Sequence, residues 1–295
     1  MQTLREALKW AHDKQVAIGH FNITDAVTLR AIFEVASELS IGLDEKIPVI
    51  IGVSEGERDF LGVSEAAALV KEIREKHDYP IYLNADHTHS IVKIKEAVEA
   101  GFDAVLFDGG KLPLEENIEL TKEVVAYVRR VNPEIVVEGE MGYIGSGSTI
   151  LKELPKGAAL TEDSITSAEQ AARFVEETGV DMLAPAVGNI HGMLKDAPNP
   201  RLFIDRIIEI KKSTNDIPLV LHGGSGTQDE DFLAAIKAGV NVIHISTEIR
   251  KAWREGVEEG LKSQPDEVSP AKLLAPALKD MKLVIERRLR LFNLI

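Results

Sequence analysis

The sequence of 295 residues contains no cysteine. This absence excludes disulfide bonds and thiolate metal ligands, so any bound metal must rest on histidine, aspartate or glutamate side chains. It also favours a reducing compartment, and we predict a cytoplasmic location.

Long apolar runs and an excess of basic residues are also missing. No apolar run approaches the roughly 18–20 residues of a membrane span. The N-terminal stretch MQTLREALKWAHDK carries charges throughout and is typical of an amphipathic helix, not of a signal peptide. The formal net charge of −14 argues against general nucleic-acid binding, which needs a basic surface. We therefore expect neither a membrane nor a nucleic-acid partner.

Eight short runs rich in β-branched residues alternate with helical stretches. The predicted strands are 16–22, 47–54, 80–87, 103–108, 135–142, 182–189, 217–221 and 240–246. Such alternation is typical of a parallel sheet. Eight units in about 250–300 residues predict an α/β fold, a closed (β/α)8 TIM barrel. A doubly wound open sheet is the structural alternative.

Between and around these strands, helical patterns complete the predicted organisation. The predicted helices are 4–14, 25–40, 55–77, 90–101, 113–131, 166–178, 200–214 and 229–238, with additional C-terminal helices at 248–262 and 270–291. A longer loop covers 143–160. No linker rich in proline, glycine or serine divides the chain, so we predict a single domain over residues 1–295.

Six of the eight histidines lie in or just after a predicted strand: His20, His87, His89, His191, His222 and His244. Catalytic groups of a barrel sit at the carboxyl ends of its strands. His87, His191 and His222 follow three different strands, and three neutral imidazoles with an open fourth position make a catalytic zinc site. The alternative is three hydrogen-bonded histidines that line a cleft.

Carboxylates accompany these histidines. Asp86 adjoins His87, where it would orient a ligand or act as a general acid/base. Glu138 and Glu140 share one strand face, and Asp108 ends a strand. Carboxylates inside a barrel need a cation or a partner. These three would hold the metal in an alternative position, orient ligand imidazoles, or form salt bridges with arginine or lysine.

Glycine-rich turns follow the last two strands, at HGGSG (222–226) and IST (245–247). Backbone N–H groups in such turns converge on anions, and barrels frequently bind phosphate at these two loops. Asn22 and Ser54 would contact substrate or simply cap helices. No lysine lies within a predicted strand, which disfavours Schiff-base chemistry.

The ordered motifs HFN, VSEG, NADHTHS, FDGG, VEGEMG, VGNIHG, LHGGSG and STEIR cover nearly the whole chain. Together they resemble the class II, zinc-dependent fructose-bisphosphate/tagatose-bisphosphate aldolase family. The resemblance implies that Zn²⁺ is bound by His87, His191 and His222, and that Asp86 is the catalytic acid/base. It implies that Asp108 and Glu140 bind a second or displaced metal position.

The resemblance also implies a phosphate and substrate site. Dihydroxyacetone phosphate would be bound by Gly192, Gly223, Ser225, His244, Ile245, Ser246 and Thr247, and Asn22, Ser54 and Gly224 complete the substrate-binding set that we predict. A monovalent cation, Na⁺ or K⁺, is expected near Gly192 and Gly223. The family analogy further predicts a homodimer or homotetramer, and the apolar faces of the C-terminal helices could serve its interface.

The implied reaction is reversible cleavage of a ketose 1,6-bisphosphate, first of all fructose 1,6-bisphosphate. The products would be dihydroxyacetone phosphate and glyceraldehyde 3-phosphate, formed through a zinc-stabilised enediolate. Asp86 would take the C4 hydroxyl proton, and a mobile loop residue would shuttle the C3 proton. The alternatives are an aldolase for tagatose bisphosphate or for another dihydroxyacetone-phosphate-dependent reaction, and a non-catalytic barrel that binds metal or sugar phosphate.

Two positions depart from the family pattern. His244 stands where the family commonly has asparagine, and Ser148 lies near the place of the usual loop glutamate. The nearest acids are Glu153 and Glu162. Either one of these acids swings into the site, or the loop proton transfer is organised differently.

Overall fold

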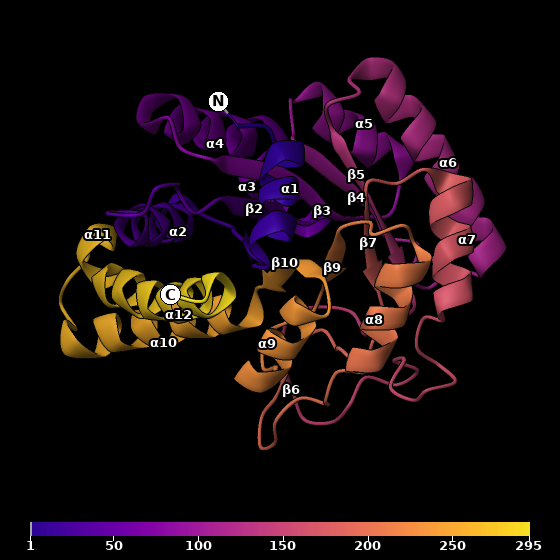
Figure 1. The fold of residues 1–295 in the computed structure, drawn as a ribbon. Coiled ribbons are helices and arrows are strands. Elements are labelled where there is room, and N and C mark those ends of the chain that lie inside the picture. Colours follow the sequence, from indigo (N-terminus) through magenta and orange to yellow (C-terminus); the bar gives the residue numbers. More distant parts are fainter. Residues whose placement is uncertain (1) are drawn as a thin grey trace.

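A computed structural model describes residues 2–295 of the chain and shows a closed barrel of parallel strands surrounded by helices (Figure 1). Around the barrel the strands follow one another as β1 (Ile18–Asn22), β2 (Val49–Val53), β3 (Ile81–Thr88), β4 (Ala104–Phe107), β5 (Val136–Met141), β7 (Met182–Pro185), β9 (Leu219–Leu221) and β10 (Val240–Ile245). Strand β10 pairs with β1 and closes the sheet. The predicted barrel is confirmed, and the open-sheet alternative is wrong.

The helices lie close to their predicted positions. They are α1 (Leu4–Lys14), α2 (Ala26–Leu39), α3 (Glu55–Leu61), α4 (Val63–His77), α5 (Ile91–Glu99), α6 (Leu114–Val131), α7 (Ala168–Thr178), α8 (Ile204–Ser213), α9 (Asp229–Lys237), α10 (Thr247–Ser263), α11 (Pro270–Leu273) and α12 (Ala275–Asn293). Asp25 and Ser90 cap α2 and α5 with their side chains, as their sequence positions indicate.

Two predicted helices are each divided in the structure. Gly62, at φ +94°, separates α3 from α4, because this left-handed backbone conformation cannot continue a helix. Proline is tolerated in the first turn of a helix but breaks a helix interior. Pro276 therefore lies in the first turn of a new helix, α12, and α11 ends before it. Strand β7 ends at Pro185, well short of the predicted residue 189, because proline cannot donate a ladder hydrogen bond.

A two-stranded parallel sheet lies outside the barrel and was not predicted. Its strands are β6 (Ile150–Leu151) and β8 (Met193–Leu194). Two-residue strands are too short to show a hydrophobic alternation in the sequence. This pairing ties the long loop after β5 to the segment that follows β7, close to His191.

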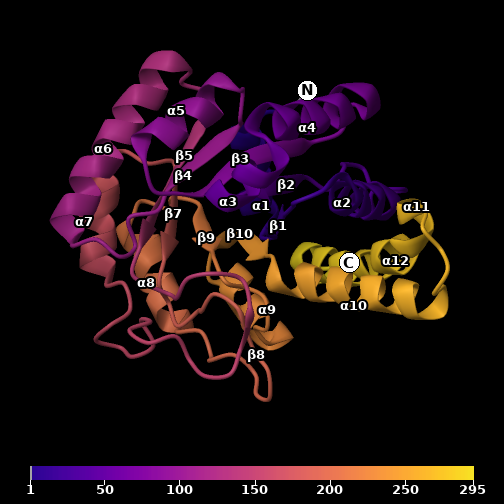
Figure 2. The same cartoon turned by 180° about the vertical axis from the view of Figure 1, so that it is seen from behind.

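The C-terminal helices form a layer beside the barrel. Helices α10 and α12 pack against each other, and α12 packs against α2, as both views of the fold show (Figures 1 and 2). From α12, the side chains of Met281, Ile285, Leu289 and Phe292 are fully buried. No helix among residues 2–295 is long and apolar enough to cross a membrane.

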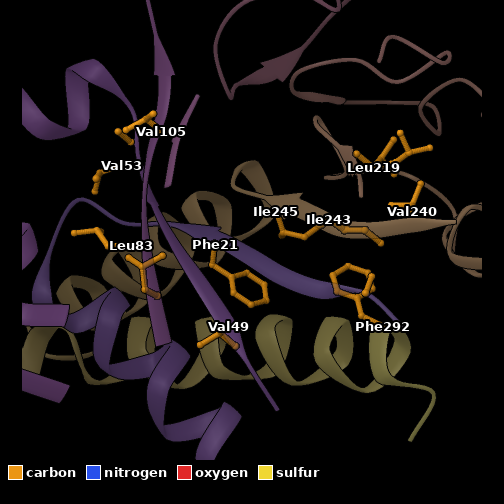
Figure 3. Close-up of a cluster of buried hydrophobic side chains, with 14 of the residues drawn as sticks. Phe21, Val49, Val53, Leu83, Val105, Leu219, Val240, Ile243, Ile245 and Phe292 are labelled. Atoms are coloured by element: carbon orange, nitrogen blue, oxygen red, sulfur yellow. The ribbon is translucent and has the colours of Figure 1, made fainter. Parts of the chain in front are cut away.

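The main core lies between the barrel and the helices around it. Outward-facing strand residues form this layer, and Figure 3 shows Phe21, Val49, Leu83 and Ile243 among them, with Phe292 of α12. Because strand side chains alternate with a period of two, the remaining residues of each strand face the barrel interior.

The barrel interior changes character along its axis. At the amino end of the strands, Ile18, Ile50 and Val242 pack against Leu4 and Leu8 of α1, which closes that end. Two residues further along, the same strand faces become polar, with His20 on β1, Asn84 on β3, Glu138 on β5 and His244 on β10. The polar layer therefore lies at the carboxyl end, where the sequence predicts the site.

Candidate active site

A cavity of about 370 Å³ opens at the carboxyl end of the barrel. That volume suits a small organic ligand. Residues from the ends of all eight barrel strands, or from the loops after them, line it, among them Asn22, Ser54, Asp86, His87, Asp108, Glu140, His191, Gly192, His222, Gly223, Ser225, His244, Ser246, Thr247 and Arg250.

A bulge at the end of β3 brings two neighbouring side chains into this cavity. The β3–β4 register shifts between Ala85 and Thr88, and His87 has φ +38°. In regular strand geometry, Asp86 and His87 would face opposite sides of the sheet. The bulge removes that alternation and aims both side chains at the same space. The sequence indicated that such a bend would be needed, but not that it occurs.

A buried arginine holds this bulge in place. Arg58 of α3 is 2% exposed, and its guanidinium donates to the carbonyl of Val53 at 2.5 Å and to Oγ1 of Thr88 at 2.9 Å. A longer contact of 3.3 Å reaches the carbonyl of Asp86. The guanidinium thereby links the end of β2 to the residues of the β3 bulge.

Three histidines converge in the cavity. His87, His191 and His222 each offer one ring nitrogen within 4.8 Å of those of the other two. The Nε2 atom of His87 and the Nδ1 atom of His222 are 3.1 Å apart, although the two residues lie 135 positions apart in the chain. Adjacent ligands of a tetrahedral zinc ion are separated by about 3.3 Å, which follows from Zn–N bonds of about 2.0–2.1 Å. The donor set therefore fits a zinc ion.

The second ring nitrogen of each of these histidines meets an oxygen acceptor. For His222 the partner is Oε1 of Glu138 at 2.7 Å, and for His87 it is Oδ2 of Asp108 at 2.9 Å. For His191 the partner is the carbonyl of Gly145 at 3.2 Å. Metal-binding histidines are typically fixed in tautomer and orientation by such partners. Among the three roles left open for Glu138 by the sequence, this contact favours that of orienting an imidazole.

Asp108 and Glu140 lie beside the Nδ1 atom of His87, on the other side of the ring from the Nε2 atom that faces His222. Oδ2 of Asp108 and Oε2 of Glu140 lie 2.9 and 3.3 Å from its Nδ1 atom. Together the three residues form a second cluster with ligand atoms within 4.8 Å of one another. No lysine or arginine salt bridge to Asp108, Glu138 or Glu140 occurs within residues 2–295. Buried Oε2 atoms on both glutamates also lack hydrogen-bond partners there, as expected of a site that receives a cation.

The ionisation of this cluster follows from its burial and its charges. Burial lowers the pKa of His191 to about 3, helped by the charge of His87, so His191 is neutral at physiological pH. Burial also disfavours charge on His87, but the carboxylates of Asp86 and Glu140 outweigh it and raise the pKa of His87 well above its ordinary value. Metal binding at His87 therefore displaces a proton.

Asp86 is buried in a network of polar side chains. Burial alone would raise its pKa, but the positive charge of the neighbouring His87 outweighs this and holds the pKa below its ordinary value. The amide of Asn22 donates to Oδ2 of Asp86 at 2.8 Å and to Oε2 of Glu57 at 2.9 Å. Asp86 is thus an oriented carboxylate that faces the cavity and can accept a proton.

The glycine-rich turns approach one another closely beside the histidines. Gly223 has φ +61°, and a Cβ atom there would lie 2.2 Å from the carbonyl oxygen of Ile190. Gly192, at φ +93°, leaves no room for a side chain beside Thr149. The hydroxyl of Ser225 accepts from the backbone N–H of Ser246 and of Glu248 at 3.2 Å each, and so caps the start of α10. A helix N-terminus with its dipole faces the cavity here.

Some sequence-predicted residues lie away from the cavity. Neither Gly224 nor Ile245 lines it, and the side chain of Ile245 is buried in the outer core. Ser54 lines the cavity and also forms a capping box with Glu57 at the start of α3. The capping role of Ser54 is thus observed, and its contact with substrate stays a prediction.

The loop after β5 reaches the cavity with Tyr143 and with small residues, but with no acidic residue. Ser146, Gly147 and Ser148 line it, whereas Glu153 and Glu162 do not. An acid from this loop would have to move before it could reach a bound substrate.

The sequence analysis assigned no role to two polar residues beside the site, His20 and Glu57. His20 lies two positions before Asn22 on β1, so the period-two rule could have placed it on the interior face. Glu57 is 5% exposed, and its other oxygen, Oε1, accepts from Arg250 at 2.5 Å. The spacing Ser54-x-x-Glu57 is that of a capping box, which could have revealed its proximity to the site.

Comparison with known proteins gives matches over nearly the full chain. The family model described as "Fructose-bisphosphate aldolase class-II" matches residues 2–295. A Bacillus licheniformis protein named "6-phospho-5-dehydro-2-deoxy-D-gluconate aldolase" is 35% identical over 304 residues, which cover 99% of this chain and 94% of that protein. A Bacillus subtilis protein named "Probable fructose-bisphosphate aldolase" is 34% identical and covers 99% of this chain and 97% of its own length.

Solved structures of aldolases share the fold. The YdjI aldolase from Escherichia coli K12 superposes with a TM-score of 0.79 at 28% identity, over 99% of this chain and 97% of that one. A fructose-bisphosphate aldolase from Campylobacter jejuni gives a TM-score of 0.81 at 22% identity, over 99% of this chain and 94% of that one. The second likeness shows the fold alone.

Proposed function

Because the chain belongs to the class II fructose-bisphosphate aldolase family and is therefore a carbon–carbon lyase, we propose that it cleaves fructose 1,6-bisphosphate reversibly. The products are dihydroxyacetone phosphate and glyceraldehyde 3-phosphate. One observation carries the assignment of the site. Three imidazoles from different strand ends converge with one free nitrogen each, while their other nitrogens meet acceptors.

His87, His191 and His222 would hold the zinc ion in this proposal, with Asp108 and Glu140 beside a second or displaced position. When bound, the ion supplies Lewis-acid polarisation of the substrate carbonyl. Glu138 fixes the His222 ring and leaves its Nδ1 atom free. We further propose a monovalent cation near Gly192 and Gly223.

Asp86 is the proton carrier at the C4 hydroxyl. Its carboxylate takes the hydroxyl proton as the C3–C4 bond breaks, C4 becomes the aldehyde carbon, and the bonding electron pair stays on C3, which then takes a proton to give dihydroxyacetone phosphate. In the condensation direction Asp86 returns its proton to the C4 oxygen. Asn22 holds the carboxylate in one orientation by donating to Oδ2. An oriented, ionised carboxylate needs no reorganisation before it accepts the proton.

The phosphate of the dihydroxyacetone phosphate half lies against the turns after β9 and β10. Gly223 and Ser225 come from the first turn, and Ser246 and Thr247 from the second, at the start of α10. Ser225 accepts from two N–H groups with its oxygen, so its hydroxyl proton is free to donate to a phosphate oxygen. Gly192 completes this side of the cavity.

Cleavage of fructose 1,6-bisphosphate by the zinc-loaded protein tests the proposal. A coupled assay that detects glyceraldehyde 3-phosphate should show turnover, and prior removal of the metal with EDTA should abolish it until zinc is restored. Full activity of the metal-free protein would contradict metal dependence.

The relative named for 6-phospho-5-dehydro-2-deoxy-D-gluconate supplies the second candidate substrate. The same assay should therefore compare this compound and tagatose 1,6-bisphosphate with fructose 1,6-bisphosphate at equal concentrations. A kcat/KM for either alternative that exceeds the value for fructose 1,6-bisphosphate tenfold would replace the proposed substrate. Binding of dihydroxyacetone phosphate without cleavage of any of the three would favour a non-catalytic role.

A homodimer or homotetramer is the assembly that we propose on family analogy. Several large apolar side chains are exposed in the single chain, including Ile41, Phe60 and Val268 at 81%, 79% and 87%. Light scattering of the purified protein should give two or four times the chain mass of 32.3 kDa. A monomer at micromolar concentration would contradict this expectation.

A further inference from the structure

Two histidines stack inside the barrel, next to the proposed zinc ligand His222. His20 of β1 and His244 of β10 are register partners on adjacent parallel strands. Their ring centroids are 3.4 Å apart, with an angle of 1° between the ring planes. Only His244 lines the cavity, so His20 lies behind it.

The barrel provides a fitted place for the His20 ring. A Cβ atom on Gly52 of β2 would lie 2.1 Å from Cε1 of His20, so only glycine there leaves room for the ring. On the far side, the amide of Asn84 on β3 lies 3.1 Å from Nε2 of His20. His20 is thus held by β2, β3 and β10, and it is fully buried.

His244 lines the cavity and has two polar ring atoms that make no hydrogen bond among residues 2–295. Both of these ring nitrogens are buried. The Nδ1 atom lies 3.5 Å from Oδ1 of Asp86, which is too long for a strong hydrogen bond. Leaving buried polar atoms unsatisfied is costly. A substrate hydroxyl or a small shift toward Asp86 would satisfy them.

The pair is unsuited to hold a metal ion. His20, Asp86 and His244 do offer ligand atoms within 4.8 Å of one another. The lone pairs of an imidazole lie in the plane of its ring, however, so two parallel stacked rings direct them along parallel lines. They cannot converge on one ion at about 2.0–2.1 Å.

We propose that His20 is a positioning residue, which stacks on His244 and fixes the plane in which the His244 ring meets the bound substrate and Asp86. The ring of His222 also packs against His244, with ring centroids 3.9 Å apart, but it is tilted by 35°. The outer torsion of a histidine side chain is broad, so without the parallel His20 ring the His244 ring would sample several orientations. Stacking removes that freedom before substrate arrives, and binding then costs less entropy. The inference rests on the proposed function, in which His244 contacts substrate.

A matched pair of substitutions isolates the stacking surface. His20→Leu fills a similar volume without a flat ring, whereas His20→Phe keeps an aromatic face. Both lose the contact with Asn84, so that contact cancels in the comparison. In the zinc-loaded protein, calorimetry should show dihydroxyacetone phosphate binding about tenfold more weakly to His20→Leu, a typical coupling between contacting residues. His20→Phe should stay within about twofold of the wild type.

The same substitutions in a His244→Asn background separate positioning from a general loss of packing. In that background, the affinities of the proteins with His20 and with His20→Leu for dihydroxyacetone phosphate should differ by less than about twofold, because the ring that His20 positions is gone. Thermal melting and zinc content of every variant report folding and metal loading. His12→Leu, at an exposed position on α1, is the surface control.

Several outcomes overturn the inference. Equal affinities of His20→Leu and His20→Phe for dihydroxyacetone phosphate would do so. An equal loss of affinity from His20→Leu with and without the His244→Asn substitution would also overturn it. So would the absence of dihydroxyacetone phosphate binding to the wild type. A wild-type protein that binds dihydroxyacetone phosphate but cleaves none of the three substrates would overturn the proposed substrate and leave the inference standing.

Discussion

Replacement of Asp86 by asparagine should lower kcat for fructose 1,6-bisphosphate cleavage by about 10²–10⁴-fold, the usual contribution of a general acid/base. Asparagine keeps the shape of the side chain, and its carbonyl oxygen can still accept from Asn22, so the fold and the metal site should persist. The amide cannot take the C4 hydroxyl proton. Steady-state kinetics together with zinc content by atomic absorption measure the effect.

Asp103→Asn is the matched control for this variant. Asp103 is a half-buried carboxylate just before β4 that pairs with Arg74 and accepts from the N–H of Leu83, away from the cavity. Its replacement should lower the melting temperature while kcat stays within about threefold of the wild type. An Asp86→Asn enzyme with more than a tenth of wild-type kcat and normal zinc content would remove Asp86 from the reaction.

The second large effect is expected for His191→Ala. Substitution of a partner that merely orients a ligand typically costs 10–100-fold in metal affinity, so loss of a direct ligand should cost at least about 10²-fold. The purified variant should therefore contain little zinc after dialysis and show no measurable cleavage at the enzyme concentration used for the wild type. Competition with a chromogenic chelator gives the zinc dissociation constant.

His89→Ala is the control for His191→Ala. His89 also lines the cavity, and its Nδ1 atom lies 3.3 Å from the carbonyl of Asp108, but it is exposed and is not part of the cluster of three histidines. Zinc affinity should stay within a few-fold of the wild type. If His89→Ala lost zinc as severely as His191→Ala, or if His191→Ala kept full zinc content, the ligand assignment would be wrong.

The sequence predicted the barrel and the convergence of its histidines, because both follow from a regular rule. Parallel strands that alternate with helices bring their carboxyl ends to one face, so the residues after each strand meet there. His87 and His222 are 135 positions apart and still come within 3.1 Å of each other. The helix divisions at Gly62 and before Pro276 follow from local residue types, so they could have been predicted from the sequence.

Other features depend on geometry that no local pattern contains. The positive φ of His87, which turns its side chain toward that of Asp86, results from a bulge supported by the distant Arg58. The stack of His20 on His244 requires the register between β1 and β10 and the space that Gly52 leaves. The single-domain organisation and the cytoplasmic location stay predictions.

The most direct measurement is anomalous diffraction at the zinc absorption edge from crystals of the zinc-loaded protein. We expect one strong peak at the mouth of the barrel, bonded at about 2.0–2.1 Å to a ring nitrogen of each of His87, His191 and His222. A peak coordinated by a different set of side chains would contradict the proposed zinc site and the chemistry built on it. The absence of a peak in a protein with full catalytic activity would contradict them as well.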